Sequence, residues 1–281
     1  MCPVHSRRGF RDDSSRSAPT YHSQLVVILP ACRARSALGR PFCETVPFEE
    51  AKLRRKSLAL SSPRTLFLDS CCRPITIKAA VQMSAEDFHA VVDTCFYGVV
   101  YTTRAAIPVM RKQKSGHIFQ VSSVGGRLAF PGSTPYHAAK SAGGGFSDAL
   151  AMEVVPFGVK ICTLEPGGIR TNYARRAGRN APKLLPEYED TVGSILKLLR
   201  NVEERSEGDP RKIADVIVQL ANSDEVPVRL ILGVDAGKWV QRAEAARASE
   251  AEKWRHFTVS TVFEDGRFDS RLYMANRGID S

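Results

Sequence analysis

Long apolar runs are missing from this sequence. No stretch of about 18 apolar residues occurs, so no segment predicts a membrane-spanning helix. The polar start also lacks the apolar core of a secretory signal, and its Asp12 and Asp13 argue against an organelle transit peptide. These absences lead us to expect a cytoplasmic protein with no membrane partner.

Cysteine and histidine occur without the spacings that bind metals or build disulfide frameworks. The seven cysteines are an odd number at irregular intervals with no CxxC, and the six histidines form no HExxH. We therefore expect reduced thiols and no metal site. The vicinal Cys71 and Cys72 are interpreted as incidental rather than as a redox pair.

Glycine is scarce in the first 80 residues, where only Gly9 and Gly39 occur. A phosphate-binding turn of three closely spaced glycines is therefore excluded from this segment. The segment also carries 14 basic against 6 acidic residues, whereas residues 81–281 carry 26 against 24. No aromatic interleaving and no recognised module accompanies this charge, so a solvated segment is favoured over a nucleic-acid site.

From residue 81 onward, helical and strand patterns alternate. We expect strands at 117–122, 159–165 and 228–232, and helices at about 85–111, at 136–156, within 188–221 and at 235–254. Such alternation predicts an α/β fold, a doubly wound parallel sheet with helices on both faces. We divide the chain into an atypical basic segment, 1–80, an ordered domain, 81–257, and a tail, 258–281.

A serine, a tyrosine and a lysine stand close together in the most informative part of the sequence. Ser123 follows an apolar run that predicts a buried strand, and Tyr136 and Lys140 are four residues apart. If Tyr136 opens a helix, Lys140 lies one turn further on the same face, where its charge lowers the phenol pKa from about 10. A catalytic group works best when its pKa approaches the working pH. The three residues therefore predict a proton-transfer site.

This pattern resembles the short-chain dehydrogenases/reductases, whose signature is a serine followed about a dozen residues later by Tyr-x-x-x-Lys. The likeness covers roughly residues 81–257 and includes the strand segment SGHIFQVSS and the Pro-Gly turn within 159–171. It implies a Rossmann-like fold and an oxidoreductase that uses NAD or NADP. The substrate it implies is a small carbonyl compound or secondary alcohol, and the assembly a homodimer or homotetramer.

The resemblance also implies roles for individual residues. Ser123 would polarise the substrate oxygen, Tyr136 would transfer the proton, and Lys140 would hold the nicotinamide ribose and lower the Tyr136 pKa. The implied cofactor-binding residues are Tyr136, Lys140, Pro166, Gly167, Ile169 and Thr171. For His137 we expect local packing or solvent exposure and no catalytic role.

The opening elements of the family cannot be found in the first 80 residues. LVVIL, residues 25–29, can form a first strand, but Arg33 and Arg35 stand near the places where glycines are expected. No Asn-Asn-Ala-Gly precedes Met83, and Cys95 stands where the family usually has a catalytic asparagine. The segment is a disordered basic tail, a diverged first half of the fold or an out-of-register gene model, the last being favoured.

These departures support a second functional hypothesis. The chain would be a remnant of the fold that binds no cofactor and acts, if at all, as an interaction or dimerisation protein.

Three consecutive glycines, 143–145, fall within the predicted helix 136–156. Each costs a helix roughly 1 kcal/mol relative to alanine, so another part of the protein must approach the helix closely there. The resemblance implies a second subunit packed across a two-fold axis. The alternative is the sheet of the same chain.

Overall fold

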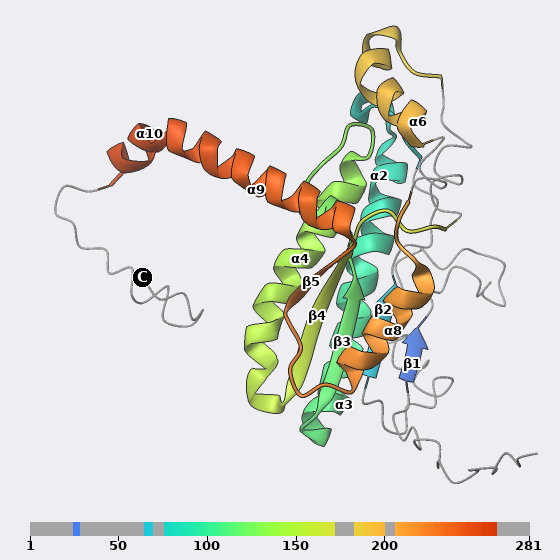
Figure 1. Ribbon diagram of the computed structural model, residues 1–281, viewed down its shortest axis with the longest axis vertical. Coiled ribbons are helices and arrows are strands. Elements are labelled where there is room, and N and C mark those ends of the chain that lie inside the picture. The colour runs from blue at the N-terminus through green and yellow to red at the C-terminus, as the bar shows by residue number, and fades with distance from the viewer. Residues whose placement is uncertain (1–24, 29–64, 70–75, 172–182, 200–205, 263–281) are drawn as a thin grey trace, which may run out of the picture.

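The computed structural model describes residues 25–28, 65–69, 76–171, 183–199 and 206–262. Within them, five parallel strands form one sheet in the order β1-β2-β3-β4-β5 (Figure 1). The strands are β1 (Leu25–Ile28), β2 (Thr65–Asp69), β3 (Gly116–Val121), β4 (Val159–Pro166) and β5 (Arg229–Leu232). The predicted parallel α/β sheet is confirmed. Two strands of the N-terminal segment also join it, with β2 beside β3 and β1 beside β2.

Helices alternate with the strands as the sequence predicts. The α-helices are α2 (Ala85–Val92), α3 (Gly98–Gln113), α4 (Thr134–Val154), α6 (Ser194–Leu199), α8 (Pro210–Ala221), α9 (Val234–Lys253) and α10 (Arg255–Ser260). Shorter turns are the 3-10 helices η3 (Ala80–Gln82), η5 (Val124–Gly126), η6 (Val155–Phe157) and η7 (Pro186–Tyr188), and the π-turns η4 (Asp93–Tyr97) and η8 (Glu189–Gly193). The predicted helix 85–111 is therefore interrupted by η4, and the predicted last helix is followed by α10.

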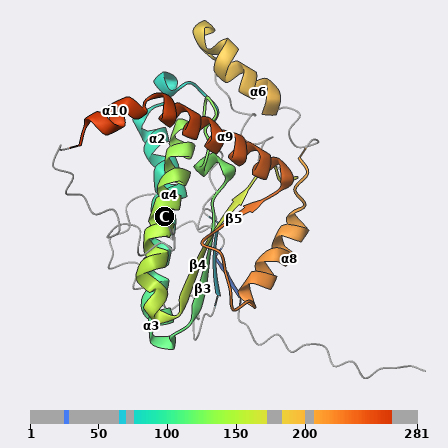
Figure 2. The same ribbon diagram turned by 60° about the vertical axis from the view of Figure 1, so that its left-hand side comes forward.

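The helices cover both faces of the sheet (Figure 2). On one face, α3 and α4 pack against Ile118 and Ile161. On the other, α8 packs against Phe119 and Leu164. Successive side chains of a strand point to opposite faces, so the continuous apolar runs of β3 and β4 are those of strands buried on both sides.

Local chemistry fixes where several helices begin. The Ser84 side chain accepts a hydrogen bond from the Asp87 amide (3.1 Å), and Asp209 accepts one from the Arg211 amide (2.8 Å). Both are N-caps, which satisfy amides that have no partner inside the helix. Pro135 lies in the first turn of α4, where its missing N–H costs nothing.

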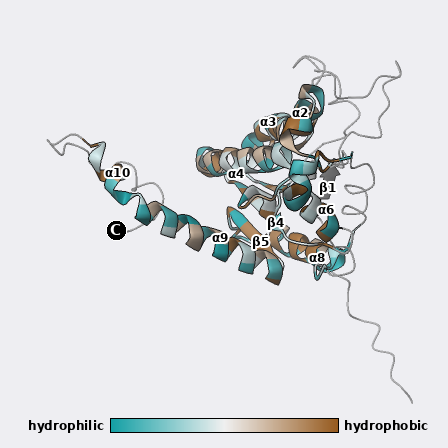
Figure 3. Ribbon diagram, turned by 90° about the horizontal axis from the view of Figure 1, so that it is seen from above, coloured by the Kyte–Doolittle hydropathy of each residue, from teal (hydrophilic) through white to brown (hydrophobic). Residues whose placement is uncertain are grey.

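Helix α9 begins where β5 ends and then projects from the body of the protein (Figure 1). Its first turns bury Ala236 and Val240 against Val124. Further along the helix most residues are exposed, and the ribbon in Figure 3 is coloured mostly as hydrophilic there. Among the described residues, no helix is both long enough and apolar enough to cross a membrane.

Candidate active site

Ser123 lies two residues beyond the carboxyl end of β3, with an extended backbone (φ −167°, ψ 161°). Its Oγ caps η5 by accepting a hydrogen bond from the Gly125 amide at 3.0 Å. This bond fixes the oxygen while the hydroxyl proton stays available for donation. The serine is thus a hydrogen-bond donor held at the edge of the sheet where ligands of α/β proteins bind.

Tyr136 and Lys140 lie in the first two turns of α4, as predicted. Lys140 is only 2% exposed, and its Nζ donates to the carbonyl oxygen of Val121 at 2.7 Å. The same nitrogen lies 5.7 Å from the centre of the Tyr136 ring. A buried ammonium is costly unless it is hydrogen-bonded, and Val121, the last residue of β3, supplies that partner.

Gly125 brings the serine and the tyrosine together. A Cβ placed on it would lie 3.0 Å from Cε1 of Tyr136, so the loop backbone passes directly against the phenol ring. Ser123, Tyr136 and Lys140 therefore converge at the carboxyl end of β3, through contacts with Gly125 and Val121.

The π-turn η4 forms another wall beside Tyr136. Its Cys95 is 4% exposed and packs in one cluster with Val91, Ala139 and Tyr136. π-Turns within helices occur often at functional sites because the extra residue redirects side chains. The sequence placed Cys95 correctly as a small buried residue but did not predict the change of helix type.

The Pro-Gly turn after β4 is held from two sides. The Gly167 amide donates to the Leu232 carbonyl oxygen (3.0 Å), and the Gly168 amide donates to Oδ2 of Asp235 (2.9 Å). A Cβ on Gly167 would lie 2.6 Å from Asp235 Oδ1, so only glycine fits there. Sequence reasoning missed Asp235, although an acid in the first turn of a helix after glycine was a weak signal for it.

An apolar pocket of about 250 Å³ lies between the ends of the strands and α8. Three of the predicted cofactor residues, Pro166, Ile169 and Thr171, line it, whereas Gly167, Tyr136 and Lys140 do not. The remaining lining is Val121, Leu164, Pro210, Ile213, Ala214, Ile217 and Leu232. A mostly apolar pocket with one hydroxyl at its rim suits a flat ring that carries a polar substituent.

Comparison with known proteins identifies the family. The short chain dehydrogenase family matches residues 75–182. Oxidoreductase BOA17 of Botryotinia fuckeliana is 42% identical over 185 residues, which are 66% of this chain and 67% of that protein. The chain belongs to the short-chain dehydrogenase family. This confirms the resemblance, and it assigns the chain to the nicotinamide-dependent oxidoreductases.

A further relative and one solved structure agree with this assignment, and a second solved structure shares the fold. The 3-ketodihydrosphingosine reductase of Bacteroides thetaiotaomicron is 35% identical over 160 residues, 56% of this chain and 59% of that protein. A short-chain dehydrogenase from Streptomyces avermitilis superposes with a TM-score of 0.64 at 28% identity and 77% coverage of each chain. One from Burkholderia phymatum, in complex with NAD, has a TM-score of 0.59 at 18% identity, covers 72% of this chain and 73% of that one, and shows the fold alone.

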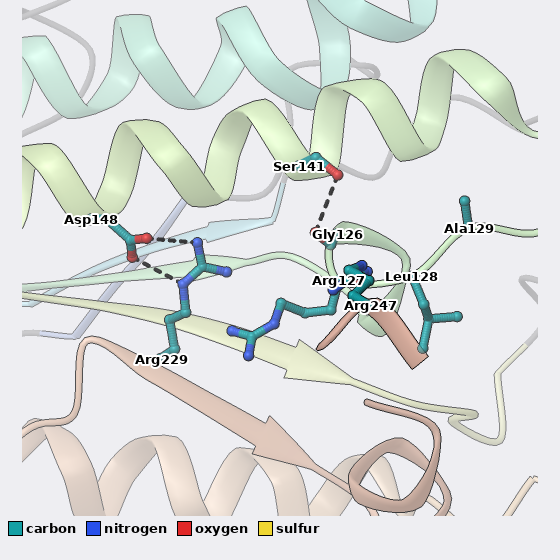
Figure 4. Close-up of a pocket in the computed structure, with 8 residues that line it drawn as sticks. All are labelled: Gly126, Arg127, Leu128, Ala129, Ser141, Asp148, Arg229 and Arg247. Atoms are coloured by element: carbon teal, nitrogen blue, oxygen red, sulfur yellow. Dashed lines mark hydrogen bonds and ion pairs between the residues drawn. The ribbon is translucent and has the colours of Figure 1, made fainter. Parts of the chain in front are cut away.

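A second, charged cavity of about 410 Å³ is lined by residues 126–129 of the loop that follows Ser123, by α4 and by Arg229 and Arg247 (Figure 4). Arg229 donates to both carboxylate oxygens of Asp148 (2.9 and 2.8 Å) and to Glu165 (2.7 Å). The Asp148 hydrogen bonds, followed by Glu165, raise the arginine pKa further. Because Arg229, Asp148 and Glu165 pair with one another, we interpret these three residues as a tie between α4, β4 and β5 and not as a ligand site of this short-chain dehydrogenase.

Proposed function

We propose that this short-chain dehydrogenase transfers a hydride between a nicotinamide cofactor and a carbonyl or secondary alcohol carbon. The convergence of Ser123, Tyr136 and Lys140 at the carboxyl end of β3 carries the proposal. One relative is named for the reduction of a 3-keto group, which supports a carbonyl substrate.

Each of the three side chains has a distinct task. The Ser123 hydroxyl, held by the Gly125 amide, donates its proton in a hydrogen bond to the substrate oxygen and polarises the carbonyl. Tyr136 supplies a proton to that oxygen during reduction and removes it during oxidation. The Lys140 ammonium, 5.7 Å from the centre of the Tyr136 ring, favours the charged phenolate over the phenol.

The described residues fit the nicotinamide end of the cofactor. The apolar pocket beside Pro166 and Ile169 would hold one face of the nicotinamide ring, and Thr171 can hydrogen-bond its carboxamide or a phosphate. The Nζ of Lys140 donates one of its three protons to the Val121 carbonyl oxygen. The other two can donate to the ribose hydroxyls. When bound, the cofactor gives or accepts the hydride. NAD and NADP both remain candidates, and the expected glycine turn near residue 33 lies outside the described residues.

Two exposed helix faces support assembly into a homodimer or homotetramer. On α4 the exposed positions Ala142, Gly145, Ala149 and Met152 form one stripe of small and apolar residues. On α3, Tyr101 is 60% exposed. Its ring stacks with that of the exposed Tyr97, which lies in η4, the turn that packs beside α4. Sedimentation that finds only monomer would contradict this assembly.

The buried free thiols Cys95 and Cys162 suit a reducing, cytoplasmic setting.

The rival hypothesis, a cofactor-free interaction protein, is favoured by one observation. The residue of η4 that lies beside Tyr136 is Cys95, where the family resemblance implies a catalytic asparagine. This hypothesis predicts a folded chain without turnover.

Replacement of Tyr136 by phenylalanine tests the proposed reaction. Tyr136→Phe keeps the ring and its packing but removes the proton, so turnover should fall about 100-fold or more. The measurement is NADPH or NADH oxidation with a panel of ketones and quinones that starts from 9,10-phenanthrenequinone. Thermal melting of the variant provides the control for folding, and full turnover by the variant would refute the assignment.

A further inference from the structure

His137, for which no catalytic role was expected, makes two hydrogen bonds to the loop that follows Ser123. Its Nδ1 lies 2.8 Å from the Gly125 carbonyl oxygen, and its Nε2 accepts a hydrogen bond from the Phe130 amide at 3.0 Å. An amide only donates, so Nε2 must be unprotonated. The proton is therefore on Nδ1, which donates to Gly125. Only this tautomer of the neutral ring satisfies both ends of the loop.

The Gly125 residue passes this constraint to Ser123. Its carbonyl oxygen is fixed by His137, and its amide is the group that holds Ser123 Oγ. A Cβ on Gly125 would lie 3.0 Å from Tyr136 Cε1 and 3.1 Å from His137 Nδ1. The glycine thus lies between the two rings, and its position sets how far the serine hydroxyl lies from the tyrosine.

Other contacts support the same loop from the opposite side. Val124 packs against α9, Arg127 pairs with Glu244, and the Phe130 ring meets Trp239 edge to face at 6.2 Å. These contacts hold the loop against α9, whereas His137 ties it to α4, the helix that carries Tyr136. Ser141 adds one more bond from α4, to the Gly126 carbonyl oxygen at 3.1 Å (Figure 4).

We propose that His137 is a positioning residue that fixes the Ser123 hydroxyl relative to Tyr136, so that both can act on one substrate oxygen. The proposal rests on the proposed oxidoreductase function. It gives the histidine no contact with substrate. Its effect on the reaction passes through Gly125 and Ser123, where a displacement of about 1 Å can cost on the order of 100-fold in rate.

Amide hydrogen exchange of the full chain, without cofactor, tests the geometry directly. In His137→Ala, the Gly125 and Phe130 amides should exchange about tenfold faster. His137→Asn keeps a donor at the Nδ1 position, so only Phe130 should lose protection. Ser141→Ala, which removes the neighbouring bond from the same helix, is the matched control and should leave both amides as in the wild type. Unchanged exchange at Gly125 in His137→Ala would overturn the proposal.

Steady-state kinetics with the best carbonyl substrate, starting from 9,10-phenanthrenequinone, tests the consequence. In His137→Ala, kcat should fall about tenfold or more while the KM for the cofactor changes less than about twofold. His137→Asn should restore most of kcat. Equal losses in kcat and cofactor affinity, shared by Ser141→Ala, would indicate general loosening and would refute the role. A third outcome separates the two proposals. If the wild type binds no cofactor but the amides exchange as expected, the proposed function would be refuted while the loop geometry set by His137 would stand.

Discussion

Cys95 lies beside Tyr136 in the proposed site and differs from the residue that the family resemblance implies there. The thiol is buried against Tyr136 and Ala139 in the π-turn η4, at the position where the resemblance to the family implies a catalytic asparagine. A thiol is a weak hydrogen-bonding group, whereas an amide has strong donors and a strong acceptor. Under the proposed function, we therefore expect a proton to pass beyond Tyr136 less readily than it would with an amide at this position.

The variant Cys95→Asn should raise turnover, since the two side chains are similar in size and the amide offers strong donors and a strong acceptor in place of the thiol. We expect a gain of about tenfold in kcat, which is less than the roughly 100-fold that a positioned acid or base contributes at minimum, because the side chain at this position acts only through Tyr136. Cys95→Ala, which offers no hydrogen bond, is the control and should not gain. Equal turnover by all three proteins would show that the relay does not pass through this position.

Residues close in sequence were the predictable part of the candidate site. Tyr136 and Lys140 could be assigned to one helix face because their spacing matches one turn, and Ser123 because an apolar strand precedes it. Asp235 and His137 could not be assigned, because their partners lie in other elements. Asp235 contacts Gly168, which is 67 positions away, and such a contact depends on the fold as a whole.

At the level of elements, the three consecutive glycines of α4 have different surroundings. A Cβ on Gly144 would lie 2.7 Å from Nη2 of Arg229, whose guanidinium is fixed by Asp148 and Glu165. For Gly143 and Gly145, no atom lies within 4 Å of that position among the described residues. The chain's own sheet thus accounts for Gly144, and the proposed second subunit for Gly145.

The pair Gly144→Ala and Gly145→Ala separates these two explanations. Gly144→Ala should lower the free energy of unfolding by about 1–3 kcal/mol, because the added methyl group displaces a paired guanidinium. Gly145→Ala should raise it by up to about 1 kcal/mol in the monomer and weaken the proposed dimer. Urea denaturation and sedimentation measure the two effects. Equal stability of the two variants would contradict the assigned role of Arg229.

Strands and helices after residue 81 were predictable from their apolar patterns. Each helix repeats apolar residues with the helical period, and each buried strand is a short continuous apolar run. β3 and β4 follow the expected 117–122 and 159–165 within one residue at each end. The π-turn η4 could not be predicted, since DTCFY suits an ordinary helix and only its packing beside α4 sets the extra residue.

For the whole molecule, the sheet is where the sequence was least informative. β1 and β2 lie within a segment whose composition favours no ordered fold, yet β2 pairs with β3 along its full length. Strand pairing across about 50 residues depends on the register of the sheet and leaves little trace in local composition. Five described strands in chain order place Ser123, Lys140 and the Pro-Gly turn at one edge, as the proposed function requires.

Titration of the purified full chain with NADPH and with NADH tests the central claim most directly. Cofactor fluorescence and thermal stability should be followed together, because a ligand that binds only the folded state raises the melting temperature. The account predicts saturable binding of at least one cofactor and a matching thermal shift. A folded chain that binds neither would contradict it and would leave the cofactor-free interaction protein as the function to test.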